Sequence, residues 1–242
     1  MIAYTPSNTR AKKLIVMDEA ERRWFESLNG APEWALIDWS RQLLLQRDEY
    51  HRVFLDVGAH CGTWALNLAE TASHVFAWEP QRRSFFRLAG GIVLNDHLES
   101  RITAFHEGVD QGGQDFTFRT LAIINEDGGG SSFERVTPAH HIPIRTEEVV
   151  CGSIDSRMES YEFYGRVGLI KVDVEGLEVE VIEGAKYVLK RHRPHLLIES
   201  WSAKRDVESA AREVRLVDRL VELDYRVVRV TGYPEMILGE PL

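Results

Sequence analysis

The 242-residue sequence contains only two cysteines, Cys61 and Cys151, far apart along the chain. Two distant cysteines form neither a CxxC metal knuckle nor a disulfide framework, which is typical of a chain from a reducing compartment. The sequence also lacks the roughly 18 consecutive apolar residues of a membrane-spanning helix and the apolar core of a signal peptide. We therefore expect a cytoplasmic protein that does not enter a membrane.

Basic residues are in deficit as well. The chain has 29 Lys and Arg against 38 Asp and Glu, a formal net charge of −9. Because binding to a nucleic-acid backbone takes most of its affinity from Lys and Arg, nucleic acid is an unfavourable partner. No HExxH, GxSxG or Walker A pattern occurs, which excludes the sites that depend on those motifs.

Short apolar runs alternate with helical segments from residue 52 onward. Strands are expected at 53–57, 74–79, 101–107, 168–174 and 194–199, and helices at 63–71, 81–95, 177–190 and 206–223. This alternation predicts an α/β fold with a mostly parallel, seven-stranded sheet and helices on both faces. The runs 225–230 and 236–238 flank a turn with Gly and Pro and predict a C-terminal antiparallel hairpin. Ligands should bind beyond the carboxyl ends of the parallel strands.

The sequence predicts an N-terminal helical extension over 1–49 and one main domain over 50–242. Helices at 18–28 and 33–47 carry Trp24, Trp34 and Trp39, which either pack against the main domain or cover a substrate cleft. The main domain has an insertion at about 110–150, where the segments 115–121 and 141–150 alternate like antiparallel strands. A glycine-rich run, 127–132, lies inside the insertion and forms either a plain connection or a gate over the substrate.

The first strand–helix turn favours a nucleoside ligand. Gly58 and Gly62 allow a tight turn and a close approach of the backbone to a ligand. The second strand ends in Glu79-Pro80, where a carboxylate can accept hydrogen bonds from ribose hydroxyls. His60 breaks the GxGxxG pattern and no Lys follows Gly62, so neither a dinucleotide fingerprint nor a P-loop is present. A ribose with a zwitterionic amino-acid tail, as in S-adenosylmethionine, suits this turn better than a pyrophosphate.

Ionisable residues gather at the end of the fourth strand. Alternation places Lys171, Asp173 and Glu175 on one side of the strand, and Glu199 ends the next strand. Because unpaired buried charge is costly, these groups either face a site or form a structural ion pair between strand and helix. In a site, Asp173 or Glu199 would accept a proton from a substrate hydroxyl or orient it, and Lys171 would hold a carboxylate. Asp173 and Glu199 supply two ligands for a divalent metal and the sequence offers no third, so a metal is not expected.

Three segments together resemble the FkbM-type S-adenosylmethionine-dependent methyltransferases: FLDVGAHCGTWALNLA, VFAWEP and, most specifically, LIKVDVEGLEVEVIEGA. The resemblance covers about residues 50–200. It implies a Rossmann-like class I methyltransferase fold and methylation of a hydroxyl oxygen. The resemblance implies cofactor contacts at Asp56, Gly58, Ala59, His60, Gly62 and Glu79. We add Pro80, the residue after Glu79, to the expected cofactor site.

We therefore expect an S-adenosylmethionine-dependent O-methyltransferase that acts on a hydroxyl of a sugar or of another small-molecule or glycan acceptor. Asp173, Lys171 and Glu199 are the expected catalytic residues. Two alternatives stay open: a nucleic-acid methyltransferase acting on ribose 2′-hydroxyls, and a catalytically silent Rossmann-like module that binds a nucleoside or a partner protein. The aromatic residues before position 40 leave a homodimer open.

Overall fold

The computed structural model describes residues 1–6, 12–28, 33–112, 116–125, 130–133, 142–161, 164–200 and 207–242. A seven-stranded sheet forms its centre, in the order β12-β13-β11-β10-β3-β4-β5. The strands are β3 (Val53–Val57), β4 (Val75–Trp78), β5 (Ile102–Phe105), β10 (Val167–Val172), β11 (His195–Glu199), β12 (Tyr225–Val230) and β13 (Tyr233–Pro241). The order reverses between β3 and β10, so this is where a ligand crevice is expected.

Helices connect the parallel central strands and cover both faces of the sheet. All five residues of β3 and all six of β10 are buried, and apolar residues predominate, as expected of strands inside a parallel sheet. Only β13 runs antiparallel to its neighbours, β11 and β12. The predicted parallel sheet and C-terminal hairpin are therefore confirmed, although β13 is longer than the predicted run 236–238.

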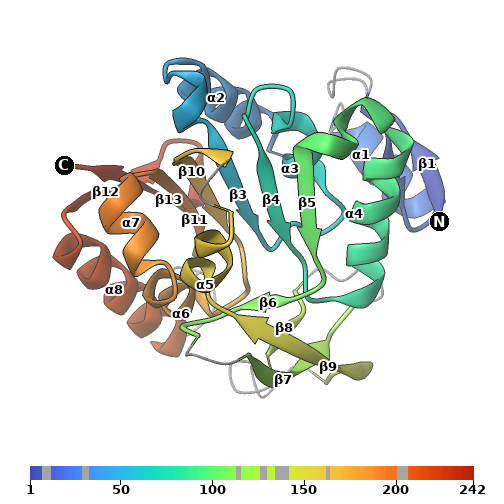
Figure 1. Ribbon diagram of the computed structural model, residues 1–242. Coiled ribbons are helices and arrows are strands. Elements are labelled where there is room, and N and C mark those ends of the chain that lie inside the picture. Colours follow the sequence, from blue (N-terminus) through green and yellow to red (C-terminus); the bar gives the residue numbers. More distant parts are fainter. Residues whose placement is uncertain are drawn as a thin grey trace.

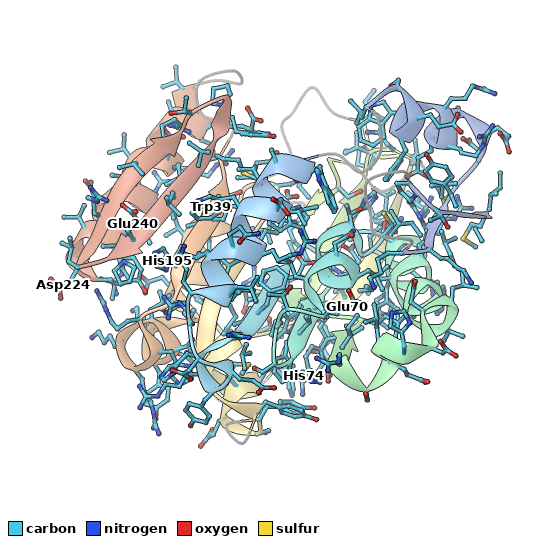
Figure 2. All side chains as sticks on the ribbon, turned by 90° about the horizontal axis from the view of Figure 1, so that it is seen from above. Trp39, Glu70, His74, His195, Asp224 and Glu240 are labelled. Carbon is cyan, nitrogen blue, oxygen red and sulfur yellow. The ribbon has the colours of Figure 1, made fainter. Side chains whose placement is uncertain are left out.

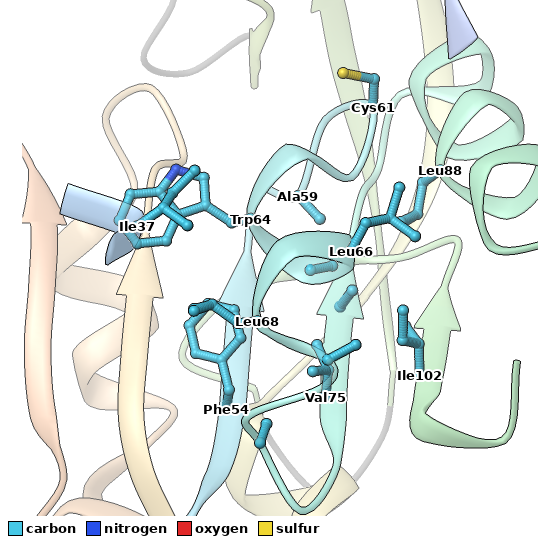
Figure 3. Close-up of a cluster of buried hydrophobic side chains, with 14 of the residues drawn as sticks. Ile37, Phe54, Ala59, Cys61, Trp64, Leu66, Leu68, Val75, Leu88 and Ile102 are labelled. Atoms are coloured by element: carbon cyan, nitrogen blue, oxygen red, sulfur yellow. The ribbon is translucent and has the colours of Figure 1, made fainter. Parts of the chain in front are cut away.

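Helices form a layer on each face of the sheet (Figure 1). One layer contains α1 (Glu19–Ser27), α2 (Trp34–Leu45), α3 (Thr63–Leu68) and α4 (Arg82–Leu94); the other contains α5 (Ile154–Glu159), α6 (Glu178–Glu183), α7 (Lys186–His192) and α8 (Val207–Glu222). Two 3₁₀ turns, Glu49–His51 and Asp96–Arg101, precede β3 and β5. Phe54, Val75, Leu66 and Leu68 meet in the core between the first layer and the sheet (Figure 3). Among the described residues, no helix is both long and apolar enough to cross a membrane.

The helix predicted over 177–190 is wrong in one respect, since it is divided into α6 and α7. Gly184 ends α6, and its carbonyl oxygen accepts a hydrogen bond from the backbone N–H of Asp155 at 2.9 Å. A Cβ atom at Gly184 would lie 2.1 Å from the carbonyl oxygen of Asp110. Because Gly184 has no side chain, the start of the insertion at Asp110 and the start of α5 at Asp155 pack directly against the backbone of Gly184.

The N-terminal segment contains two short strands besides its predicted helices. Strands β1 (Ile2–Tyr4) and β2 (Leu14–Val16) pair antiparallel. The buried Arg87 of α4 donates to the carbonyl oxygen of Ile15 at 2.8 Å and forms an ion pair with Glu21. These contacts attach the N-terminal segment to α4. Three-residue strands are too short for a periodic pattern, so the sequence did not predict them.

The three tryptophans of the N-terminal helices differ in burial. Trp34 packs against the hydrophobic core. Trp24 is 50% exposed, and Trp39 on α2 is 37% exposed (Figure 2). Packing against the main domain is therefore confirmed for Trp34, while about half of Trp24 and over a third of Trp39 stay exposed.

The insertion forms a second, four-stranded sheet in the order β6-β9-β7-β8. Its strands are β6 (Gly108–Val109), β7 (Thr117–Ile123), β8 (Ser132–Phe133) and β9 (Arg145–Gly152). The antiparallel pairing of β7 with β9 confirms the pattern of the predicted segments 115–121 and 141–150. In Figure 1 this small sheet lies below the central sheet, immediately after β5. The insertion therefore faces the edge of the sheet where a ligand is expected.

Candidate functional site

The turn after β3 lies directly against the end of β10. Gly58 has φ +81°, and a Cβ atom on it would lie 1.8 Å from the carbonyl oxygen of Asp173. The backbone N–H of Asp173 donates to the carbonyl oxygen of Val57 at 2.9 Å. Only glycine can adopt this left-handed backbone and also allow this close approach. Gly58 therefore lets the turn after β3 pack directly against the end of β10.

Glu79, which follows β4, faces the same turn. Its Oε2 accepts a hydrogen bond from the backbone N–H of His60 at 2.8 Å, and its Oε1 accepts one from Gln81 at 2.8 Å. Burial raises the pKa of Glu79, while His60 and the two backbone N–H groups oppose this shift. Each carboxylate oxygen retains a second lone pair for a ligand.

A cavity opens between the glycine turn, the ends of β4 and β10, and the small sheet. Its lining residues all lie between positions 57 and 175: Val57, Gly58, His60, Trp78, Glu79, Pro80, Gln81, Glu107, Gly108, Val109, Leu121, Gly130, Ser131, Phe133, Asp173, Val174 and Glu175. The insertion supplies part of this wall through Leu121 and Phe133. Gly130 and Ser131 belong to the glycine-rich run, whose residues 127–129 lie outside the described part of the chain. The N-terminal tryptophans are not part of this wall.

The predicted cofactor residues divide into two groups. Gly58, His60, Glu79 and Pro80 line the cavity. Three others are not among the lining residues: Asp56 is 0% exposed, Ala59 is buried in the hydrophobic core, and Gly62 is the N-cap of helix α3. Their contact with the cofactor stays a prediction.

His60 is paired with the cysteine that follows it. Burial opposes a charge on the imidazole, yet the Cys61 sulfur raises the pKa of His60 to about 9. Burial likewise opposes a thiolate, and His60 lowers the pKa of Cys61 to about 7. Cys61 is 1% exposed, so His60 is the member of the pair that reaches the cavity.

Lys171 is buried behind the cavity wall. Its Nζ donates to the carbonyl oxygen of Gly58 at 2.8 Å and to Asp173 Oδ2 at 3.1 Å, and it lies 3.6 Å from Asp56 Oδ1. Burial opposes its charge, but the nearby carboxylates raise the pKa of Lys171. The ion pairs of Lys171 with Asp56 and Asp173 thus link β3 to the end of β10. They do not link a strand to a helix, which was the structural alternative that the sequence left open.

Asp173, Glu175 and Glu199 converge in front of this lysine. One carboxylate oxygen from each lies within 4.8 Å of the others, and the Asp173 and Glu199 side chains share a hydrogen bond. Although burial opposes it, Lys171 and this hydrogen bond lower the pKa of Asp173. Strand alternation grouped Glu175 with Lys171 and Asp173, but β10 ends at Val172 and Glu175 has φ +52°, so a turn and not the strand brings Glu175 to this cluster. Converging carboxylates alone do not define a metal site, and none is assigned.

The far wall of the cavity follows β5, one of the strand ends beyond which a ligand is expected. Glu107 lines it and accepts a hydrogen bond from Arg157 Nε at 2.9 Å. The Arg157 guanidinium lies over the rings of Phe116 and Phe105, 4.5 and 5.3 Å from their centroids. In the sequence, the only indication that Glu107 belongs to the site is its position at the end of the predicted third strand, 101–107. Arg157 comes from α5, 50 residues further along the chain.

We expect Lys171→Met to lower the free energy of unfolding by about 3–5 kcal/mol at pH 8, because it leaves the carboxylate of Asp56 buried without its cation. Urea unfolding measures this loss, with the exposed Lys190→Met as control. Burial raises the pKa of Asp56 above its ordinary 3.8, so an unfolded chain releases this proton first and stability falls as the pH rises. The deficit of Lys171→Met should therefore be smaller near pH 4, and an equal deficit at both pH values would contradict this origin.

Comparison with known proteins identifies the family. The model of the methyltransferase FkbM domain matches residues 56–227, which include the glycine turn, Glu79, Lys171, Asp173 and Glu199. The chain belongs to the FkbM methyltransferase family. This confirms the resemblance noted in the sequence.

Individual relatives agree with this assignment. The hexuronic acid methyltransferase AglP of Haloferax volcanii is 27% identical over 184 residues, which are 76% of this chain and 71% of AglP. An FkbM methyltransferase structure from Methylobacillus flagellatus has a TM-score of 0.52 at 19% identity and covers 80% of this chain. This chain spans only 44% of that protein. The O-methyltransferase TomG of Streptomyces achromogenes, solved with S-adenosylmethionine, has a TM-score of 0.54 at 11% identity, covering 94% of this chain and 92% of TomG. These structural matches confirm the Rossmann-like methyltransferase fold.

Proposed function

We propose that this FkbM-family chain transfers a methyl group from S-adenosylmethionine to a hydroxyl of a sugar or glycan. The observation that carries the proposal is the position of two carboxylates in one cavity. Glu79 and Asp173 both line it, on either side of the glycine turn. Glu79 suits the ribose of the cofactor, and Asp173 suits the hydroxyl that receives the methyl group.

The residues around Glu79 fit the cofactor. The free lone pairs of Glu79 would accept hydrogen bonds from the two ribose hydroxyls, and Gly58 leaves space that a Cβ would fill. Trp78, Leu121 and Phe133 offer apolar walls for the adenine ring. When bound, S-adenosylmethionine supplies a methyl group activated on a positively charged sulfur. An acidic cavity wall favours that charge.

Asp173 is the residue best placed to serve the acceptor. Lys171 keeps the pKa of Asp173 low, so the group stays ionised and its carboxylate can accept a hydrogen bond from a substrate hydroxyl. The hydroxyl proton would pass to Asp173 as the hydroxyl oxygen forms its new bond to the methyl group and becomes acidic. Glu199 shares a hydrogen bond with Asp173 and fixes its orientation. We assign Lys171 and Asp56 to positioning, because both lie behind the wall. Alignment of the reactants contributes about 7–11 kcal/mol in favourable cases, and a general base adds about 10²–10⁴-fold.

The choice of a sugar acceptor rests on the relative AglP, whose name gives hexuronic acid as its substrate. The local charge narrows this choice. This part of the site has three carboxylates, from Asp173, Glu175 and Glu199, and one lysine, Lys171. Lys171 already forms ion pairs with Asp173 and Asp56. A neutral hydroxyl acceptor therefore suits this cavity better than a polyanion.

The test is methyl transfer from isotopically labelled S-adenosylmethionine to a panel of hexoses, hexuronic acids and their glycosides, with a short RNA as a separate arm. Mass spectrometry should detect the label on a hydroxyl oxygen of a sugar, and the RNA should stay unlabelled. Label on the RNA, or on no sugar although S-adenosylhomocysteine binds, would contradict the proposal.

A further inference from the structure

The segment that carries Asp173 and Glu175 is a tight turn between β10 and α6. Its backbone is left-handed at two successive residues, Glu175 with φ +52° and Gly176 with φ +112°. A left-handed residue other than glycine costs of order 1–3 kcal/mol and persists only when the surrounding contacts hold it. The contacts of this turn therefore decide where the two carboxylates of the cavity wall point.

One side of the turn is held by the glycine turn of β3. The N–H of Asp173 donates to Val57, and the Asp173 carbonyl oxygen packs against Gly58. Lys171 joins the Asp173 side chain to the Gly58 carbonyl oxygen. These contacts fix the first residue of the turn and leave its second half, Glu175 and Gly176, to be held from elsewhere.

The other side is held by Glu178, the first residue of α6. Its Oε1 accepts a hydrogen bond from the backbone N–H of Gly176 at 2.8 Å. The sequence pattern predicts that Glu178, Glu180 and Glu183, on the helix after the fourth strand, are solvated or paired with Lys186. The pairing is confirmed for Glu183. Glu178 is only partly exposed, and its carboxyl binds the turn instead. Burial raises the pKa of Glu178 to about 7, and Glu175 adds to the shift, while the N–H groups of Gly176 and Glu178 and the Arg212 of α8 oppose it.

We propose that Glu178 is a positioning residue that fastens the Asp173–Gly176 turn and so aims Asp173 and Glu175 at the acceptor. Glu178 itself is not part of the cavity wall, so it acts through the turn. The inference rests on the proposed function, since it concerns the acceptor half of that site. The cofactor half, at Glu79, has its own contacts and should be independent of Glu178.

Two variants of Glu178 separate the hydrogen bond from the volume of the side chain. Glu178→Gln keeps both the volume and an oxygen that can accept from Gly176. Glu178→Met keeps the approximate volume and removes the acceptor, so it disturbs packing less than alanine would. Glu183→Gln, on the same helix, is the matched control, because Glu183 pairs with Lys186 and Arg219 on the protein surface.

Three measurements are made on each variant: hydrogen exchange of peptides covering residues 173–178, calorimetric binding of S-adenosylhomocysteine, and turnover of a sugar from the labelled panel. In Glu178→Met we expect faster exchange in the turn, a Kd within about twofold of wild type, and a kcat lower by about 10- to 100-fold, the loss typical of a reacting group misplaced by about 1 Å. Glu178→Gln should restore protection and most of kcat, and Glu183→Gln should match wild type throughout.

The proposal is overturned if Glu178→Met keeps wild-type protection of the turn, if Glu178→Gln behaves like Glu178→Met, or if cofactor affinity falls as far as turnover. Failure of the proposed function gives a different result. Wild-type protein would then bind no S-adenosylhomocysteine or methylate no sugar, while hydrogen exchange would still report whether Glu178 holds the turn.

Discussion

Replacing Glu79 by alanine should weaken the binding of S-adenosylhomocysteine by about 10²–10⁴-fold. The reason is that two hydrogen bonds to a charged carboxylate, each contributing about 1.5–3 kcal/mol, are lost together. The same change removes the acceptor for the backbone N–H groups of His60 and Gln81, which shape the turn around the ligand. Isothermal titration calorimetry of wild type and Glu79→Ala measures the difference directly.

The control for this experiment is Glu99→Ala, which removes an exposed carboxylate that does not line the cavity. It should leave Kd unchanged. Thermal unfolding of both variants distinguishes a lost ligand contact from a lost fold, because Glu79 is buried. A folded Glu79→Ala protein that binds with wild-type affinity would remove Glu79 from the cofactor site.

Replacing Asp173 by asparagine should lower turnover by about 10²–10⁴-fold, the usual contribution of a general base. Asparagine keeps the shape of the side chain but cannot take a proton from the acceptor hydroxyl. Because Lys171 lowers the pKa of Asp173, the wild-type carboxylate stays ionised at pH values below the ordinary range of aspartate. Turnover should accordingly show no loss from this group as the pH falls from 8 to 6.

Binding of S-adenosylhomocysteine to Asp173→Asn should stay within about twofold of wild type, which separates the acceptor half of the site from the cofactor half. Asp218→Asn, an exposed position on α8, is the matched control. If Asp173→Asn retains wild-type turnover, Asp173 is not the base. If it loses cofactor affinity in step with turnover, its role is in binding the cofactor.

The sequence predicted the features of this molecule that are set by local pattern. The buried runs of β3 and β10 and the helix after β4 lie where the pattern predicts them, and the helix after β3 begins at the predicted residue but ends at Leu68 instead of Thr71. The positions of Gly58 and Glu79 followed from their places at the ends of two strands. Because parallel strands bring such ends together at one edge of a sheet, residue order alone was enough to assign Gly58 and Glu79 to the same ligand site.

The features that the sequence did not predict depend on contacts between distant segments. Strand alternation places Lys171 and Asp173 on the same side, yet Lys171 faces Asp56 behind the cavity wall and Asp173 lines the cavity. The difference arises because β10 ends at Val172 and the turn that follows, with Glu175 and Gly176, departs from strand geometry. The far wall at Glu107 and Phe133 depends on how the insertion packs against β5. Glu178 was predicted to be solvated or paired with Lys186 for the same reason: its partner is the backbone N–H of Gly176 in a left-handed turn, and residue type does not predict such a bond.

A crystal structure with S-adenosylhomocysteine bound would test the proposed site most directly. We predict that the ribose hydroxyls lie within hydrogen-bond distance of both Glu79 oxygens and that the adenine lies between Trp78 and the insertion. The sulfur should face the side of the cavity that carries Asp173. A nucleoside bound elsewhere, or a ribose that does not contact Glu79, would contradict this assignment of the site.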